Sequence, residues 1–119
     1  MDLVIGGAYQ GKLSFAREKY SLSEADVCTC TEETEPDRGV RCVEHLERYV
    51  YYCVKNGLPV NTDFRPDAVL IADDVFCGVV PIDPLERAWR EETGRFIVAL
   101  SRKADNVYRL FCGLSMQLK

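Results

Sequence analysis

The N-terminal region carries the feature that most limits what this chain can fold into. A short apolar run at residues 3–5 leads straight into the pattern Gly6-x-x-x-x-Gly11-Lys12, and a helical pattern follows. Glycines let a backbone bend tightly and turn its N–H groups inward, so that these groups and the helix N-terminus surround a phosphate that the lysine also reaches. The order of strand, loop and helix predicts a phosphate-binding loop. The alternative is a glycine-rich turn with a surface lysine.

The predicted nucleotide-binding residues are those of this loop and the start of the helix after it. They are Gly6, Gly7, Ala8, Tyr9, Gln10, Gly11, Lys12, Leu13 and Ser14. One position departs from the usual pattern, because the residue after the lysine is normally Ser or Thr, whose hydroxyl holds Mg²⁺, and here it is Leu13. Ser14 is a poor substitute, since one residue of helix turns a side chain by about 100°.

Length and charge narrow the class of protein. With 119 residues and 47% hydrophobic composition, we expect one globular domain over residues 1–119. The net charge is −4 and the basic residues are scattered, which argues against a nucleic-acid partner. No apolar run approaches the roughly 20 residues that span a bilayer, so we expect no membrane partner and a cytoplasmic location.

Six cysteines are many for a chain of this size, yet none forms a CxxC pair. We expect most of them to be buried free thiols. Cys28 and Cys30 would share one face of a strand, so a redox or metal pair is the alternative there.

Strand and helix patterns alternate along the chain. After the first strand and loop, helical spacing predicts helices at residues 12–20 and 38–56, and apolar runs predict strands at residues 25–31, 68–72, 106–112 and 114–119. Asp83, Pro84 and Glu86 together mark the start of a last helix that runs to about residue 104. Residues 77–81 are expected to form a turn or lid. This alternation predicts an α/β fold with a mostly parallel sheet flanked by helices.

Two carboxylates follow the apolar run at residues 68–72, which suits a strand buried on both faces of a parallel sheet. An acid at the C-terminal end of such a strand lies near a phosphate loop and can hold Mg²⁺. Asp73 and Asp74 are therefore the candidate metal ligands and partners of Lys12. The alternative is that they only cap the turn after the strand.

The second half of the chain resembles the adenosylcobinamide kinase/adenosylcobinamide-phosphate guanylyltransferase family of cobalamin biosynthesis. The matching features are the apolar residues 69–72, Asp73-Asp74, Gly78-Val79-Val80-Pro81, Leu85, Arg87, Arg90, Gly94-Arg95, Leu100, Ala104-Asp105-Asn106-Val107, Gly113 and Lys119. The segment Gly6-Gly7-Ala8-x-x-Gly11-Lys12 also fits the loop of that family.

The resemblance implies a small RecA-like phosphate-loop domain and two reactions. The family phosphorylates the aminopropanol arm of adenosylcobinamide and then transfers GMP from GTP through a histidine intermediate. It implies ATP or GTP and a corrinoid as substrates, with Mg²⁺ as cofactor. Carried over residue by residue, Lys12 and Asp74 are catalytic candidates, and Arg87, Arg90 and Arg95 lie near the edge of the active site.

The resemblance also singles out His45, which is the only histidine of the chain and lies on the predicted helix at residues 38–56. It would be the guanylylated residue, since imidazole is a good nucleophile near neutral pH. The alternative is a histidine on the surface of a helix.

Three functions remain open from the sequence, of which the third is an unrelated small-molecule kinase. The first is a short, divergent kinase, transferase or both. The second is a nucleotide-binding or interaction module of the same fold with impaired catalysis, which is favoured by Leu13 and by Ile97-Val98 where the family has an Asn-Gln pair. The tyrosine-bearing helix makes a homo-oligomer a further expectation.

Overall fold

The computed structural model describes residues 1–75 and 82–119. Within these residues a single sheet has the strand order β2-β3-β4-β1-β5-β6. The strands are β1 (Asp2–Gly6), β2 (Val27–Thr29), β3 (Cys42–Glu44), β4 (Val69–Asp73), β5 (Asn106–Phe111) and β6 (Leu114–Gln117). All neighbours pair in parallel except β5 and β6, which form an antiparallel hairpin at one edge. The prediction of a mostly parallel α/β sheet is confirmed.

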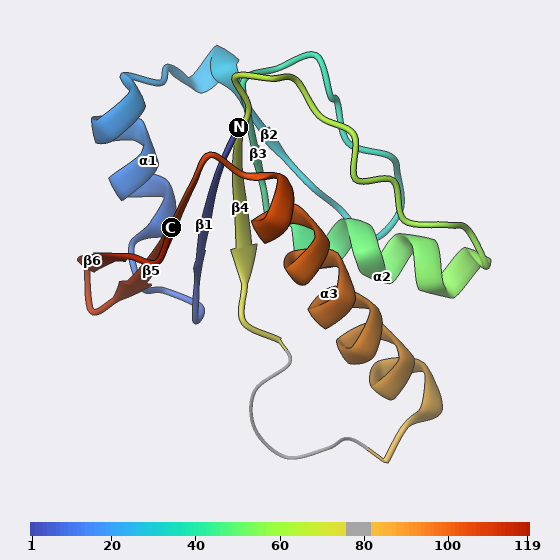
Figure 1. Cartoon of the computed structure of the whole chain (residues 1–119). Helices are drawn as coiled ribbons and strands as arrows, with labels where there is room; N and C mark the ends of the chain where they lie inside the picture. Colours follow the sequence, from blue (N-terminus) through green and yellow to red (C-terminus); the bar gives the residue numbers. More distant parts are fainter. Residues whose placement is uncertain (76–81) are drawn as a thin grey trace.

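Helices cover both faces of this sheet (Figure 1). Helix α1 (Lys12–Tyr20) lies on one face, and α2 (Leu46–Asn56) and α3 (Pro84–Lys103) lie on the other. Adjacent residues of β1 show the two cores: Leu3 packs with residues of α2 and α3, whereas Val4 packs with Ala16 of α1. A central parallel strand buried on both faces has this pattern.

Helix α3 begins where its sequence predicts. The Asp83 side chain accepts a hydrogen bond from the Leu85 N–H at 3.2 Å, and Pro84 is the first helical residue. The indole N–H of Trp89 donates to the backbone carbonyl of Glu47 at 2.7 Å, which ties α3 to the first turn of α2. This contact holds the first turn of α2 in place against α3.

The prediction of one continuous helix at residues 38–56 is wrong. Residues Cys42–Glu44 form strand β3, and α2 begins only at Leu46. Cys42 and Val43 face opposite sides of the sheet and are both fully buried, which a strand between β2 and β4 allows. The helical spacing from Val43 to Leu46 spans a strand-to-helix junction, so the periodicity was misleading. His45 consequently sits at this junction as the residue before α2, and not within a helix.

Smaller differences concern the neighbouring segments. The strand expected at residues 25–31 is a short 3₁₀-helix, Glu24–Asp26, followed by the three-residue β2. The turn or lid expected at residues 77–81 lies outside the described residues. None of the helices within residues 1–75 and 82–119 is long and apolar enough to cross a membrane.

The described cysteines are free thiols, as predicted for most of the six. Cys30, Cys42 and Cys53 are buried, Cys28 is half-buried and Cys112 is exposed. Burial raises the pKa of the Cys30 and Cys42 thiols to about 12, so both stay protonated near neutral pH.

Candidate functional site

The glycines of the loop between β1 and α1 meet two backbone requirements. A Cβ on Gly6 would lie 2.6 Å from the backbone carbonyl oxygen of Leu110, so β1 and β5 approach this closely only without a side chain there. Gly11 precedes α1 with φ at 85°, a left-handed conformation that glycine adopts at little cost. The loop therefore turns the chain sharply from the end of β1 into the first turn of α1.

Lys12 is the first residue of α1, and its side chain is almost fully buried. The ammonium group donates to the backbone carbonyl of Gly7 at 2.6 Å and forms an ion pair with Oδ1 of Asp73 at 2.8 Å. A buried cation needs such partners, because leaving water without them costs several kcal/mol. The loop therefore curls around its own lysine, which is fixed against the end of β4.

A pocket of about 320 Å³ opens at this edge of the sheet. It is lined by residues 8–14 of the loop, by Glu44, His45 and Arg48 at the junction of β3 and α2, and by Ile71 and Asp73 of β4. The pocket lies beyond the carboxyl ends of parallel strands, where open α/β sheets bind their ligands. The loop with the start of α1, the junction of β3 and α2, and the end of β4 thus all contribute polar side chains to this one pocket.

His45 faces three carboxylates. Its Nδ1 lies 3.2 Å from Oε1 of Glu47 and 3.9 Å from Oδ2 of Asp73, and its Nε2 lies 3.7 Å from Oε1 of Glu44. The residue has φ at 56°, a conformation that few non-glycine residues adopt. This backbone conformation ends β3, starts α2 and directs the imidazole toward β4.

Glu47 was not foreseen as a site residue, although it lies in the first turn of α2. Its side chain is only 5% exposed, and Oε1 accepts a hydrogen bond from the backbone N–H of Asp73 at 3.1 Å. Oε2 is buried and has no hydrogen-bond partner among the described residues. Burial and, secondarily, the nearby Asp73 carboxylate raise the pKa of the Glu47 carboxyl. One sequence signal could have indicated its burial: Glu47 lies three residues before Val50, so the two share the buried face of the helix.

The two adjacent aspartates have different surroundings. Asp73 faces Lys12 and lines the pocket, whereas Oδ2 of Asp74 lies 3.9 Å from the guanidinium of Arg109. Successive residues at the end of a strand point to opposite faces, so only one of the pair can face the loop. The half-buried Leu13 packs against the core beneath α1 and also lines the pocket, as Ser14 does.

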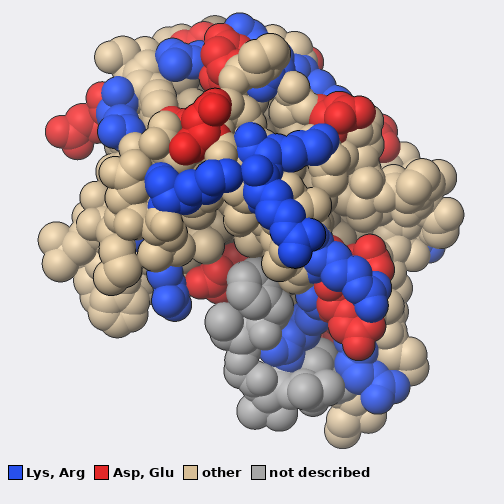
Figure 2. All heavy atoms as spheres, in the orientation of Figure 1, with Lys and Arg blue, Asp and Glu red and all other residues tan. Residues whose placement is uncertain are grey.

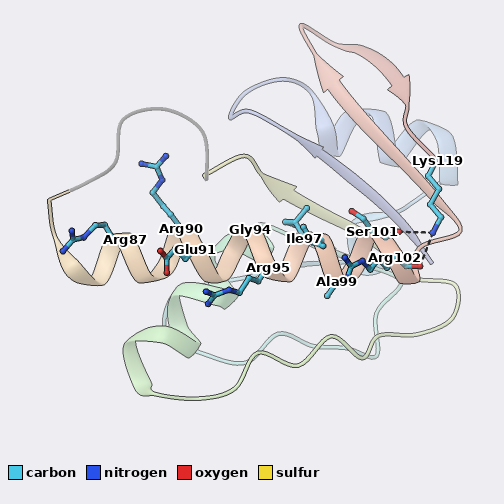
Figure 3. Close-up of a pocket in the computed structure, with 11 residues that line it drawn as sticks. Arg87, Arg90, Glu91, Gly94, Arg95, Ile97, Ala99, Ser101, Arg102 and Lys119 are labelled. Atoms are coloured by element: carbon cyan, nitrogen blue, oxygen red, sulfur yellow. Dashed lines mark hydrogen bonds between the residues drawn. The ribbon is translucent and has the colours of Figure 1, made fainter.

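The three arginines expected at the edge of the active site line a different surface. Arg87, Arg90 and Arg95 lie along a groove of about 1170 Å³ beside α3 (Figure 3). Among the described residues, this groove shares no lining residue with the loop pocket. Figure 2 shows Lys and Arg side chains gathered over this helix. At the far end of the groove, the Lys119 ammonium donates to the carbonyls of Ser101 and Arg102 at 3.0 and 3.1 Å. The structure therefore brings Lys12, His45 and Asp73 together around the loop pocket, whereas the three arginines line the groove beside α3.

A comparison with protein families identifies a match. The family model described as cobinamide kinase / cobinamide phosphate guanyltransferase matches residues 40–118, about two thirds of the chain. The matched segment runs from the start of β3 to the end of β6 and includes His45, Glu47 and Asp73, while the glycine-rich loop lies before it. A search of curated proteins found no match.

Proposed function

Because the chain belongs to the cobinamide kinase / cobinamide phosphate guanyltransferase family of cobalamin biosynthesis, we propose that it binds ATP or GTP at the Gly6–Lys12 loop and phosphorylates adenosylcobinamide. The corrinoid hydroxyl attacks the γ-phosphorus, the bond from that phosphorus to the β-bridging oxygen breaks, and the nucleoside diphosphate leaves. Catalysis of this reaction consists mainly of positioning and of neutralising charge on the transferred group.

One observation carries the proposal: Lys12 lines the pocket, and two partners hold its ammonium group in place. Asp73 keeps the ammonium group at 2.8 Å, and the second partner is the carbonyl of Gly7, which belongs to the loop itself. A phosphate oxygen can replace that carbonyl without moving the lysine away from Asp73. A cation fixed in advance stabilises developing phosphate charge without a cost of reorganisation.

The family implies Mg²⁺ with the nucleotide, and the residues of the pocket fit such an ion in part. Oδ1 of Asp73 pairs with Lys12, which leaves Oδ2 for a cation, and Glu44 adds a second carboxylate to the pocket. Leu13 adds no hydroxyl. Asp73 would hold the ion, which when bound would neutralise charge on the β- and γ-phosphate oxygens.

Guanylyl transfer through His45 is the second candidate, because His45 lines the same pocket as the loop. In that reaction an imidazole nitrogen attacks the α-phosphorus of GTP, pyrophosphate leaves, and the phosphate of the phosphorylated corrinoid then displaces the histidine. The three carboxylates within 3.9 Å of the imidazole disfavour the approach of an anionic phosphate. This arrangement ranks phosphoryl transfer first.

The test of the kinase proposal compares two lysines of one helix. Lys12→Met keeps an apolar stem but removes the buried cation, and Lys19→Met is the exposed control on α1. We expect Lys12→Met to weaken ATP or GTP binding about 10- to 100-fold, since a hydrogen bond to a charged group contributes roughly 1.5–3 kcal/mol. We also expect it to stop transfer of label from γ-labelled nucleotide to adenosylcobinamide. Equal calorimetric affinity of Lys12→Met and wild type would contradict the proposal.

The second candidate has its own readout. Wild-type chain is incubated with α-labelled GTP, denatured and examined for covalent label, and His45→Asn serves as the comparison. Label on wild type that is absent from His45→Asn would establish the transferase step. Transfer from γ-labelled nucleotide without label on the chain would leave the kinase reaction alone.

A further inference from the structure

Three side chains from two elements converge beside the loop pocket. His45 precedes α2, Glu47 lies in its first turn, and Asp73 ends β4. Each of the three offers one potential metal-ligand atom, and these atoms all lie within 4.8 Å of one another. Ligand atoms about 2.0–2.2 Å from one divalent ion are themselves about 3–4 Å apart. The distances of 3.2 and 3.9 Å from Nδ1 of His45 to Glu47 and Asp73 agree with that spacing.

An independent observation points to a missing positive charge at this cluster. The Glu47 side chain is only 5% exposed, and its Oε2 has no hydrogen-bond partner among the described residues. An unpaired buried carboxylate oxygen is costly, and a bound cation is one way to satisfy it. The proximity of Asp73 adds a second negative charge to the same small volume.

The surroundings of His45 resemble those of a metal-ligating histidine. If Nδ1 faces the ion, Nε2 carries the proton and points toward Oε1 of Glu44 at 3.7 Å. The other oxygen of Glu44 accepts a hydrogen bond from the Thr29 hydroxyl at 2.7 Å. Ligating histidines commonly direct their second nitrogen at a carboxylate that is itself held by a further partner.

Charge and access also suit a divalent ion. Two carboxylates and a neutral imidazole carry two negative charges, and Lys12 pairs with Oδ1 of Asp73, leaving Oδ2 on the side of His45. The side chains of His45 and Asp73 are 29% and 18% exposed, and both line the loop pocket. An ion can therefore enter through that pocket.

We propose that His45, Glu47 and Asp73 bind a divalent transition-metal ion, of the class of Mn²⁺, Co²⁺ and Zn²⁺, in the absence of nucleotide. Mg²⁺ prefers oxygen ligands alone, whereas a set of one imidazole and two carboxylates suits these metals. The site goes beyond the nucleotide-dependent function proposed above, because its three ligands come from the protein.

The experiment uses the full chain after treatment with a chelator and its removal, with no nucleotide present. Co²⁺ is titrated and its visible absorption recorded. We expect one saturable site, displacement by Zn²⁺ and no displacement by excess Mg²⁺. Because the cysteines are rival ligands, the spectrum also identifies the donors: nitrogen and oxygen ligands give no intense thiolate-to-cobalt charge-transfer band.

Two variants test the ligands and a third serves as a control. His45→Asn removes the imidazole, and Asn tolerates the left-handed backbone conformation of this position. Glu47→Gln removes the negative charge but keeps an oxygen that can accept the hydrogen bond from the backbone N–H of Asp73. Each is expected to weaken Co²⁺ binding at least tenfold. Asp74→Asn, whose carboxylate faces Arg109, is expected to keep the wild-type affinity.

Three results would overturn the proposal: no saturable Co²⁺ binding by wild type, wild-type affinity in His45→Asn, or a spectrum dominated by thiolate ligands. Circular dichroism checks that each variant is folded, and if Glu47→Gln does not fold, His45→Asn decides alone. Since nucleotide is absent throughout, failure of this site leaves the test of Lys12 unaffected.

Discussion

Substitution of Glu47 by Gln tests the electrostatics of the site directly, because it removes a buried charge with almost no change of shape. The amide oxygen can still accept the N–H of Asp73, which now bonds Oε1 of Glu47 at 3.1 Å. The amide NH₂ takes the place of Oε2, the atom without a partner among the described residues, and carries no charge. In chelator at pH 8, we expect Glu47→Gln to be more stable than wild type.

The magnitude follows from the unsatisfied oxygen. Leaving a buried polar group without a partner costs about 1–3 kcal/mol, and removing that cost should raise the free energy of unfolding by the same amount. For a chain of this size, this gain corresponds to a rise in melting temperature of roughly 4 °C per kcal/mol.

The gain should depend on pH in a defined direction. Burial raises the folded-state pKa of the Glu47 carboxyl above its ordinary value of about 4.3. Between these two values the folded chain binds more protons than the unfolded chain, so the contribution of Glu47 to stability falls as pH rises through this window. Gln does not titrate. The advantage of Glu47→Gln should therefore be small below about pH 4 and reach its full size above the folded-state pKa.

Urea denaturation at several pH values, with chelator present, measures the difference. Wild type at the same pH values is the reference. Glu92→Gln on α3, whose partly exposed carboxylate pairs with Arg95, is a control that should show little change, because exposed ion pairs contribute little. If Glu47→Gln is less stable than wild type at pH 8 under these conditions, the buried carboxylate is compensated in the metal-free protein and the reasoning fails. Adding Zn²⁺ should reverse the order, since a bound ion stabilises only the folded chain that holds it.

Further substitutions test other parts of the site. Gly6→Ala places a Cβ 2.6 Å from the Leu110 carbonyl, so we expect a loss of about 1–3 kcal/mol in urea denaturation, and an unchanged midpoint would contradict the packing of β1 against β5. Leu13→Ser restores the usual hydroxyl and should strengthen binding of Mg²⁺–nucleotide, measured by calorimetry, by up to about tenfold. Asp73→Asn should weaken nucleotide binding more than Asp74→Asn, because only Asp73 pairs with Lys12; equal effects would contradict that assignment.

Local patterns were sufficient to predict most of the fold. The helix start at Asp83 depends on neighbouring residues alone, and the alternation of strands and helices limits the possible sheets. The segment at residues 38–56 was misread because Val43 and Leu46 have helical spacing while Cys42 and Val43 are buried between two other strands. Pairing with strands distant in sequence overrode the local period there.

The candidate site was predictable only where its residues belong to one local motif. The loop and Lys12 are such a motif. The choice of Asp73 over Asp74 depends on which face of β4 is directed at α1, and the role of Glu47 depends on the backbone of Asp73, which lies 26 residues away. A resemblance to a family assigns expected roles to residues of this sequence, but it does not give their positions in space. It therefore did not predict that Arg87, Arg90 and Arg95 line a groove beside α3 and not the loop pocket.

Two unusual features of the chain are related through Asp73. On the side of α1, Leu13 lacks the hydroxyl that commonly helps a phosphate loop to hold its metal, and its half-buried side chain lines the pocket and packs against the core. On the side of α2, His45 and Glu47 place an imidazole and a buried carboxylate next to Oδ2 of the same aspartate. Since Lys12 occupies the other oxygen, an ion at Asp73 would draw its ligands from α2 and not from α1. The loop hydroxyl would then be dispensable for metal binding, because the protein ligands lie on the opposite side of the aspartate.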